Sequence, residues 1–372
     1  MYLATEHSSE AAYNKVCQST AWNFPNAQGV KDILSFHKVE SLIATLTGVE
    51  KVQHNMCPNS CAAFTGPYSN LEECPLCGAS RWNQECLQGT NGWSRVPTKR
   101  FTTIPLGPQL QVLYRNPDQA RHMHYLHECT QEIIAELRQT GSIPLVDDIT
   151  AGWDYLGAVL DGDIKEDNIV IMVSLDSAQL YESKQSDCWI YIWVILNLAP
   201  DKRYKKVHVC PGGFILASNK PKNIDSFLFI GFHHIAALQH EGLRIWDASQ
   251  DHVFSSDLYL LFTTADGPGL VCWDGMVGHS GKNGCCIYCP APGRHKFHGT
   301  HYYPALLRPQ GNCAPCSDHP DINVFQLPLG GSGDYAHNLE RLISAPSQRQ
   351  WDIRKTETGI MKPPLILGLN PA

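Results

Sequence analysis

Two short pairs of cysteines are the residues of this chain best suited to chemistry. They are Cys57-Pro-Asn-Ser-Cys61 and Cys74-Pro-Leu-Cys77. Two such hooks, separated by a short loop, present four thiolates to one tetrahedral zinc ion. Pro58 and Pro75 stiffen the turns, and the metal would replace a core that so small a segment cannot build. We therefore predict a closed structural zinc site formed by Cys57, Cys61, Cys74 and Cys77.

A second group of cysteines and histidines begins at Gly284-Cys-Cys-Ile-Tyr-Cys289. Cys289 forms a hook with either Cys285 or Cys286, and histidines that follow could complete a second zinc site. The segment holds more candidate ligands than one zinc ion needs, so the pattern does not decide which of them bind. The candidates are Cys285, Cys286, Cys289, His295, His298 and His301. The alternative is a few buried thiols and surface histidines in a basic loop. Cys313 and Cys316 form another hook with no partner pair nearby.

Two aspartates each come directly after an apolar run that is typical of a strand. Asp176 follows Ile169–Leu175, and Asp266 follows the run that begins at Leu258. If the two strands are parallel neighbours, both carboxylates emerge at one end of a sheet and can hold Mg²⁺ or Mn²⁺. Such a metal lowers the pKa of a water or hydroxyl nucleophile. The alternative is that each aspartate only starts a turn, and four other acids compete for the role: Asp187, Asp225, Asp247 and Asp274.

The elements that would position these aspartates follow from the apolar pattern after residue 168. It predicts three strands, a helix and a fourth strand, in the order Ile169–Leu175, Cys188–Leu198, Tyr204–Leu216 (interrupted at Pro211–Gly213), Ile224–Glu241 and Leu258–Thr264. Two earlier helices are expected over Val30–Leu46 and Pro117–Thr140. The Gly-, Pro- and Thr-rich stretch from Gln88 to Pro108 is expected to be a loop. The sequence thus predicts an α/β protein.

Composition limits the classes of function. The chain has 372 residues, 43% of them hydrophobic, 17% charged, and a net charge of -7, which argues against coating nucleic acid by charge alone. The first ten residues lack the basic and apolar regions of a signal peptide, and the longest apolar run, Trp189–Ala199, is too short to span a bilayer. We therefore expect the fifteen cysteines to be reduced thiols or metal ligands in the cytosol or nucleus.

Several segments together resemble the transposase of CACTA (En/Spm-type) DNA transposons of fungi and plants. The resemblance covers about residues 54 to 370. It is carried by the order and spacing of eight segments: Cys57–Cys61 with Glu73–Trp82, Ser174–Tyr181, Asn197–Pro200, Asn219–Leu228, His233–Gln239, Gly242–Asp247, Gly284–Cys289 and His301–Pro304.

The resemblance implies an RNase H-like mixed sheet with flanking helices and a catalytic site of the DDE/D type. Asp176 and Asp266 match its first two metal-binding aspartates, and the family's cysteine–histidine insertion matches 285–301. The third acid should follow this insertion, but neither Glu340 nor Glu357 lies in a segment that matches it. We therefore expect a fragment of a transposase, located in the nucleus. Its partners would be transposon-end and target DNA, with self-association or an element-encoded protein as further partners.

On this basis the chain divides into six segments. They are an N-terminal region (1–50), a zinc knuckle (51–86), a helical linker (87–167), a partial catalytic core (168–283), the Cys/His insertion (284–319) and the start of the following region (320–372). The first functional hypothesis is a transposase that cleaves and joins DNA. The second is a catalytically inactive zinc-containing DNA- or protein-binding module derived from one. The third is an unrelated zinc-stabilised interaction protein.

Overall fold

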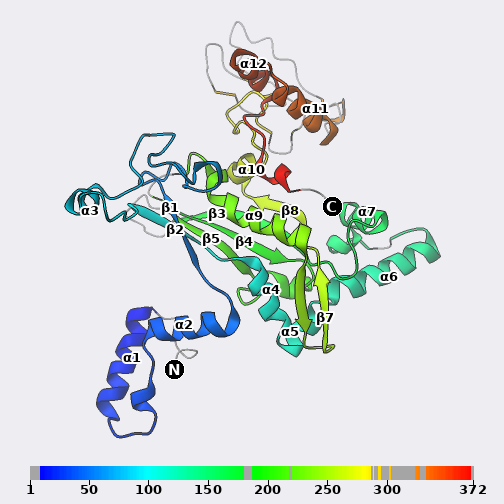
Figure 1. Cartoon of the computed structure of the whole chain (residues 1–372). Coiled ribbons are helices and arrows are strands. Elements are labelled where there is room, and N and C mark those ends of the chain that lie inside the picture. Colours follow the sequence, from blue (N-terminus) through cyan, green and yellow to red (C-terminus); the bar gives the residue numbers. More distant parts are fainter. Residues whose placement is uncertain are drawn as a thin grey trace, which may run out of the picture.

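A six-stranded mixed sheet forms the centre of the computed structural model, which describes residues 9–143, 145–179, 187–217, 220–285, 288, 292–294, 301–302, 323–326 and 332–369 (Figure 1). Across the sheet the strands follow the order β1 (Val52–Met56), β2 (Lys99–Thr103), β5 (Cys210–Ala217), β4 (Asp187–Ile195), β3 (Val170–Gln179) and β8 (Tyr259–Ala265). Every neighbouring pair is antiparallel except β3 and β8, which run parallel.

Strand β3 is buried on both faces along its first half, which explains its continuous apolar sequence. Ile171, Val173 and Leu175 belong to the main core, whereas Val170 packs into a second core on the other face. Helix α9 (Ile224–Glu241) covers the main core with Phe227, Leu228, Phe232 and Ile235. Helices α6 (Tyr125–Thr140) and α7 (Trp153–Asp161) supply the second core.

The four predicted strands and the helix are present in the predicted order, with a two-stranded hairpin inserted before the last strand, and helix α9 has the predicted bounds. The third strand is shorter than predicted, because β5 begins at Cys210 rather than Tyr204, and it runs through Pro211–Gly213 without the expected interruption. The side chain of Asn223 accepts a hydrogen bond from Ser226 N–H at its start, and Gly242 ends it with a positive φ of 72°. Strand β3 continues past the expected end at Leu175 to Gln179, so Asp176 lies within the strand.

The helix predicted over Pro117–Thr140 is wrong in one respect, because the structure divides it into α5 (Pro117–His122) and α6. The N–H of Leu126, which would bond to His122 in a continuous helix, donates instead to the carbonyl of Asn197, at 3.2 Å. This tertiary bond breaks the helix. The helix expected over Val30–Leu46 is a 3₁₀ turn (Val30–Asp32) followed by α2 (Phe36–Thr47).

The loop expected from Gln88 to Pro108 is also wrong, because it contains β2 and the start of α4 (Leu106–Tyr114). Strand β2 is short, with Phe101 and Thr103 buried between more polar neighbours. Pairing with β1 and β5 stabilises it. A hairpin of β6 (Leu243–Asp247) and β7 (His252–Ser256), which the sequence reading missed, separates α9 from β8 and contacts α4.

The remaining elements extend or connect this centre. Two helix pairs, α1–α2 and α11–α12, extend away from the sheet in different directions (Figure 1). The helices not yet given are α1 (Glu10–Asn23), α3 (Gln84–Gly89), α8 (Pro200–Arg203), α10 (Gly267–Trp273), α11 (Ser332–Ile343) and α12 (Gln348–Thr358), with 3₁₀ turns at Gly66–Tyr68, Ile149–Ala151, Val324–Gln326 and Leu365–Gly368. Within the described ranges no helix combines the length and apolar character needed to cross a membrane.

Candidate metal centres

The four predicted cysteines lie on two backbone turns of the same kind. Cys57 N–H donates to the carbonyl of Ala62 at 2.9 Å, and Cys74 N–H donates to the carbonyl of Ala79 at the same distance. Gly78, with a φ of 69°, reverses the chain after the second hook. These bonds fix the backbone on both sides of each hook, so the four thiols point towards one common centre.

The sulfur atoms of Cys57, Cys61, Cys74 and Cys77 all lie within 4.8 Å of one another. Those of Cys57 and Cys77 are 3.5 Å apart. Zinc–sulfur bonds of about 2.3 Å in a tetrahedron require sulfurs about 3.8 Å apart, so the cluster fits one zinc ion. The sequence prediction that these four residues come together is confirmed.

The four thiols differ in the direction in which their surroundings shift the pKa. Burial raises the pKa of Cys57, Cys61 and Cys74. Cys77 is exposed, and the N–H of Ala79, helped by its other hydrogen-bond partners, lowers its pKa to about 6. One thiolate is therefore available near neutral pH, and a cation is needed to hold the three buried sulfurs in charged form.

Backbone and hydroxyl contacts fasten this centre to the first turn of α9. Asn223 N–H donates to the carbonyl of Cys61 at 2.9 Å, and Ala63 N–H donates to Oγ of Ser226 at 2.8 Å. Thr65 Oγ1 donates to the carbonyl of Ser226. The cysteine centre is thus attached directly to the helix that covers the main core.

The register of the parallel strands places the two predicted aspartates together. Leu175 of β3 is opposite Ala265 of β8. Asp176 is the next residue of β3, and Asp266 directly follows β8 as the N-cap of α10. Neighbouring strands lie about 4.8 Å apart. Both aspartates are exposed. Asp176 Oδ1 accepts from Ser177 N–H at 2.6 Å and Asp266 Oδ1 from Gly269 N–H at 2.8 Å.

Further charged groups gather near Asp266. Burial has the largest effect on the thiol of Cys272 and raises its pKa, while Lys220 and Lys362 lower it and Asp225 and Asp266 raise it. All four charges therefore lie close enough to act on one thiol. Asp225 forms an ion pair with Lys362. This edge of the sheet combines carboxylates with lysines.

The other competing aspartates have structural surroundings. Asp247 is fully buried and accepts hydrogen bonds from Ser249, Gln250 and His124, whose Nε2 is 2.9 Å away. Burial alone would raise the pKa of Asp247, but these bonds outweigh it and lower the pKa. Burial raises the pKa of Asp274. No local sequence pattern indicated the His124–Asp247 pair, because the two residues are far apart along the chain.

The second cysteine–histidine cluster lies mostly outside the described residues, as do Cys286, Cys289, His295, His298, Cys313 and Cys316. Cys285 and His301 are described, but within the described residues only the Cys57–Cys77 set forms a group of three or more potential metal ligands. Of the two late glutamates, Glu340 is exposed on α11, and Glu357 forms an ion pair with Arg341.

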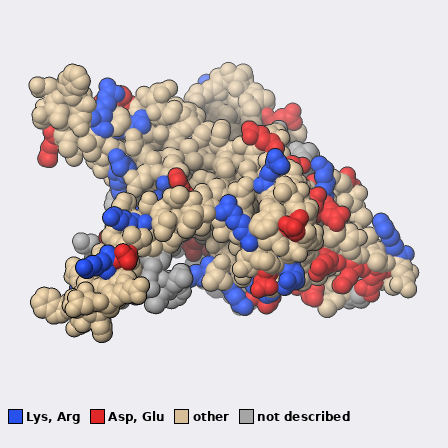
Figure 2. Space-filling model, turned by 60° about the horizontal axis from the view of Figure 1, so that its bottom comes forward, with Lys and Arg blue, Asp and Glu red and all other residues tan. Residues whose placement is uncertain are grey.

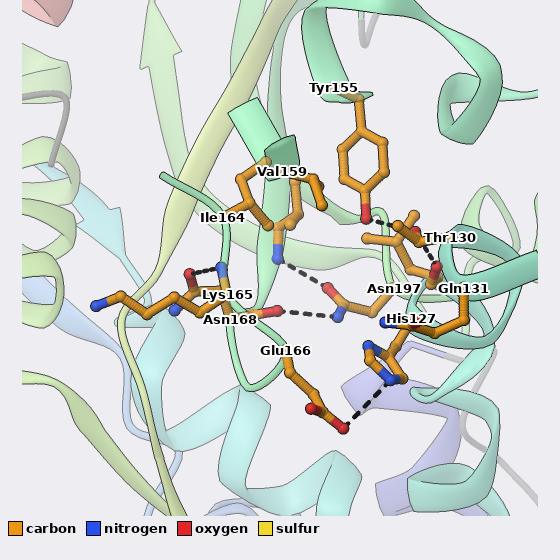
Figure 3. A pocket seen from close by; sticks show the side chains of 12 residues that line it. His127, Thr130, Gln131, Tyr155, Val159, Ile164, Lys165, Glu166, Asn168 and Asn197 are labelled. Atoms are coloured by element: carbon orange, nitrogen blue, oxygen red, sulfur yellow. Dashed lines mark hydrogen bonds and ion pairs between the residues drawn. The ribbon is translucent and has the colours of Figure 1, made fainter. Parts of the chain in front are cut away.

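A small hollow of about 60 Å³ beneath α6 and α7 illustrates how the start of β3 is held (Figure 3). Asn197 Oδ1 accepts from Val170 N–H at 2.8 Å, and its Nδ2 donates to the carbonyl of Asn168 at 3.2 Å. The hydroxyls of Thr130 and Tyr155 are 2.8 Å apart. Because these polar groups satisfy one another, we interpret the hollow as structural support for β3.

The surface charge is uneven. In Figure 2, acidic side chains are most frequent on one side of the molecule, and basic ones are scattered over the rest of the visible face. The segment from α6 to the start of β3 is rich in Asp and Glu and contains only two basic residues, Arg138 and Lys165. A polyanion would be repelled there.

Comparison with known proteins does not assign the chain to a family. No family model matches the chain, and no curated protein is similar to it in sequence.

Proposed function

We propose that the chain is a DNA transposase of the CACTA type, or a piece of one, that uses a metal-dependent site at Asp176 and Asp266. The observation that carries the proposal is their position one residue past the Leu175–Ala265 pair of two parallel strands. Each carboxylate has one oxygen bonded to a backbone N–H. Among the described residues no hydrogen bond reaches the second oxygen of either carboxylate, so it can contact a cation.

The topology supports an RNase H-like core. The resemblance implies an RNase H-like mixed sheet with flanking helices, and the sequence pattern predicts three strands, a helix and a fourth strand. Strands β3, β4 and β5, helix α9 and strand β8 follow that order, with β8 beside β3. The β6–β7 hairpin is an addition between the helix and the fourth strand.

The chemistry follows from the residues at this edge. Bound Mg²⁺ or Mn²⁺ would acidify a water or hydroxyl and offset charge at the phosphate. Asp176 and Asp266 would hold the cation. Water attacks the phosphorus at the transposon end, and the bond between that phosphorus and the 3′ oxygen breaks. The freed 3′ hydroxyl then attacks a target phosphodiester, whose own 3′ oxygen leaves.

Two lysines at the same edge are suited to the DNA backbone. Lys220 is exposed and stands over the ring of Trp189, 5.6 Å from its centroid. Lys362 is partly exposed beside Asp225. The cysteine centre, with zinc as its ion, would be structural, because four thiolates leave no open coordination position.

The test compares strand cleavage and metal binding in matched variants. Asp176→Asn and Asp266→Asn should each reduce Mn²⁺-dependent cleavage of a duplex carrying the element's terminal repeat by at least about 100-fold. Asp154→Asn, an exposed aspartate on α7, is the control. Fe²⁺ with ascorbate should cut the polypeptide near 176 and 266 in the parent and not in the two variants. Equal cleavage in the parent and Asp176→Asn would reject the site.

A second candidate is an inactive zinc-containing DNA- or protein-binding module derived from such an enzyme. It is favoured by the contrast between the two sites, because the cysteine cluster is complete whereas Glu357, a late acid, is engaged by Arg341. This alternative predicts DNA or protein binding that Asp176→Asn leaves unchanged, no cleavage, and no Fe²⁺-dependent cutting at the aspartates.

A further inference from the structure

A cleft of about 220 Å³ lies between α9, β4 and the connection from β2 to α4. Its walls are largely apolar, with Ile104, Leu106, Trp193 and Ile230 among them, and the described lining residues include no Lys, Arg, Asp or Glu. An apolar cavity of about 150 Å³ accommodates benzene. The size and lack of charge therefore suit an uncharged molecule as large as a fused two-ring compound.

Tyr191 lines the inner end of this cleft and carries a polar group that nothing satisfies. Its side chain is fully buried, and its hydroxyl has no hydrogen-bond partner within the described part of the chain. Burial raises the pKa of Tyr191, so the hydroxyl stays protonated and can donate. A buried polar group without a partner is rare in native proteins and calls for one.

Three glycines make room for this tyrosine. A Cβ at Gly212 or Gly213 would lie 2.2 or 2.4 Å from the Tyr191 ring, and a Cβ at Gly231 would lie 2.8 Å from its hydroxyl. Gly231 also lines the cleft. The hydroxyl is therefore next to the cleft wall at a point where the wall has no side chain.

A histidine, His234, also lines the cleft. His234 Nε2 accepts a hydrogen bond from Gly107 N–H at 3.1 Å, and burial, with His233 nearby, lowers the pKa of His234. The neutral ring then carries its proton on Nδ1. His233 is exposed and marks the open side of the cleft. The unpartnered hydroxyl of Tyr191 thus favours a ligand that accepts a hydrogen bond.

We propose that this cleft binds an uncharged, mostly apolar molecule of two-ring size whose acceptor oxygen receives a hydrogen bond from the Tyr191 hydroxyl. The site does not depend on the transposase proposal, since it lies on none of the metal-binding residues.

The experiment measures binding of 1-indanone and of indane, which lacks the carbonyl, to the full chain by ligand-observed NMR. The parent should bind 1-indanone about fivefold more tightly than indane, as one net hydrogen bond implies. Tyr191→Phe should bind both probes equally. Ala237→Leu, which adds side-chain volume to the cleft wall, should bind neither. Tyr155→Phe, a buried tyrosine whose hydroxyl is already bonded to Thr130, is the matched control and should bind like the parent.

Several results would overturn the proposal. One is the absence of 1-indanone binding to the parent at millimolar concentration. Another is unchanged binding by Ala237→Leu, which would place the probe elsewhere. A carbonyl preference that persists in Tyr191→Phe would remove the assigned hydrogen bond.

Discussion

Removing the hydroxyl of Tyr191 should stabilise the unliganded protein, whereas the same change at Tyr155 should destabilise it. Both side chains are buried, at 0% and 3% exposure. The Tyr155 hydroxyl is 2.8 Å from Thr130 Oγ1, but that of Tyr191 has no partner in the described structure. A satisfied hydrogen bond contributes about 1 kcal/mol net, and an unsatisfied buried group costs about 1–3 kcal/mol. Tyr191→Phe should therefore raise the free energy of unfolding by about 1 kcal/mol, and Tyr155→Phe should lower it by about 1 kcal/mol.

The assay is equilibrium urea unfolding followed by circular dichroism, with zinc held at one concentration because a bound metal shifts apparent stability. Equal m-values would show that only stability has changed. The sign is the decisive result. If Tyr191→Phe lowers stability as much as Tyr155→Phe does, the Tyr191 hydroxyl has a hydrogen-bond partner in the unliganded protein. The inference that this hydroxyl is buried without a partner would then be wrong.

Three further predictions concern the metal centre, a buried ion pair and an acid-sensitive contact. Cys74→Ser should reduce bound zinc from one per chain to well below one by atomic absorption, whereas Cys86→Ser, outside the cluster, should not. Arg203→Ala should lower the free energy of unfolding by about 3 kcal/mol in urea, because it leaves the Asp148 carboxylate without two 2.8 Å bonds; a loss below about 1 kcal/mol would contradict this. The pKa of Asp247 is lowered in the folded state. Its ionised carboxylate therefore stabilises the folded protein above the unfolded-state pKa of about 3.9, and this stabilisation is lost as pH falls through the folded-state pKa. Asp247→Asn should therefore flatten stability against pH below about pH 4, and an unchanged acid limb would refute the assignment.

Local signals made part of the fold predictable. Helix α9 was predicted at its observed bounds because Asn223 caps its start and Gly242 ends it. The first and last strands of the predicted core were recognised because each packs against the two cores, which gives both a largely apolar sequence, although β8 is only partly buried. The pair of cysteine hooks was predictable for a different local reason, because the spacing of the cysteines within each hook nearly determines the geometry of the turn.

What the sequence did not predict depends on contacts between distant residues. The break between α5 and α6 is set by Leu126 bonding to Asn197. Strands β1 and β2 are short and partly polar, so their pairing with each other, and that of β2 with β5, stabilises them more than their composition does. The environment of Tyr191 likewise requires glycines from both β5 and α9. No local pattern carries that information.

The bonds from Cys61 and Ala63 to the start of α9 have a practical consequence for studying this protein. Strands β3 and β5 end at the same side of the sheet, and α9 begins there. Because the cysteine centre is bonded to the start of α9, it supports the side of the molecule that holds Asp176. In the proposed transposase, a chelator that removed zinc from this centre would loosen this support and lower cleavage without removing a catalytic ion. Loss of activity in EDTA is therefore ambiguous here. The dependence on catalytic metal must be measured by omitting Mg²⁺ and Mn²⁺ while zinc stays bound.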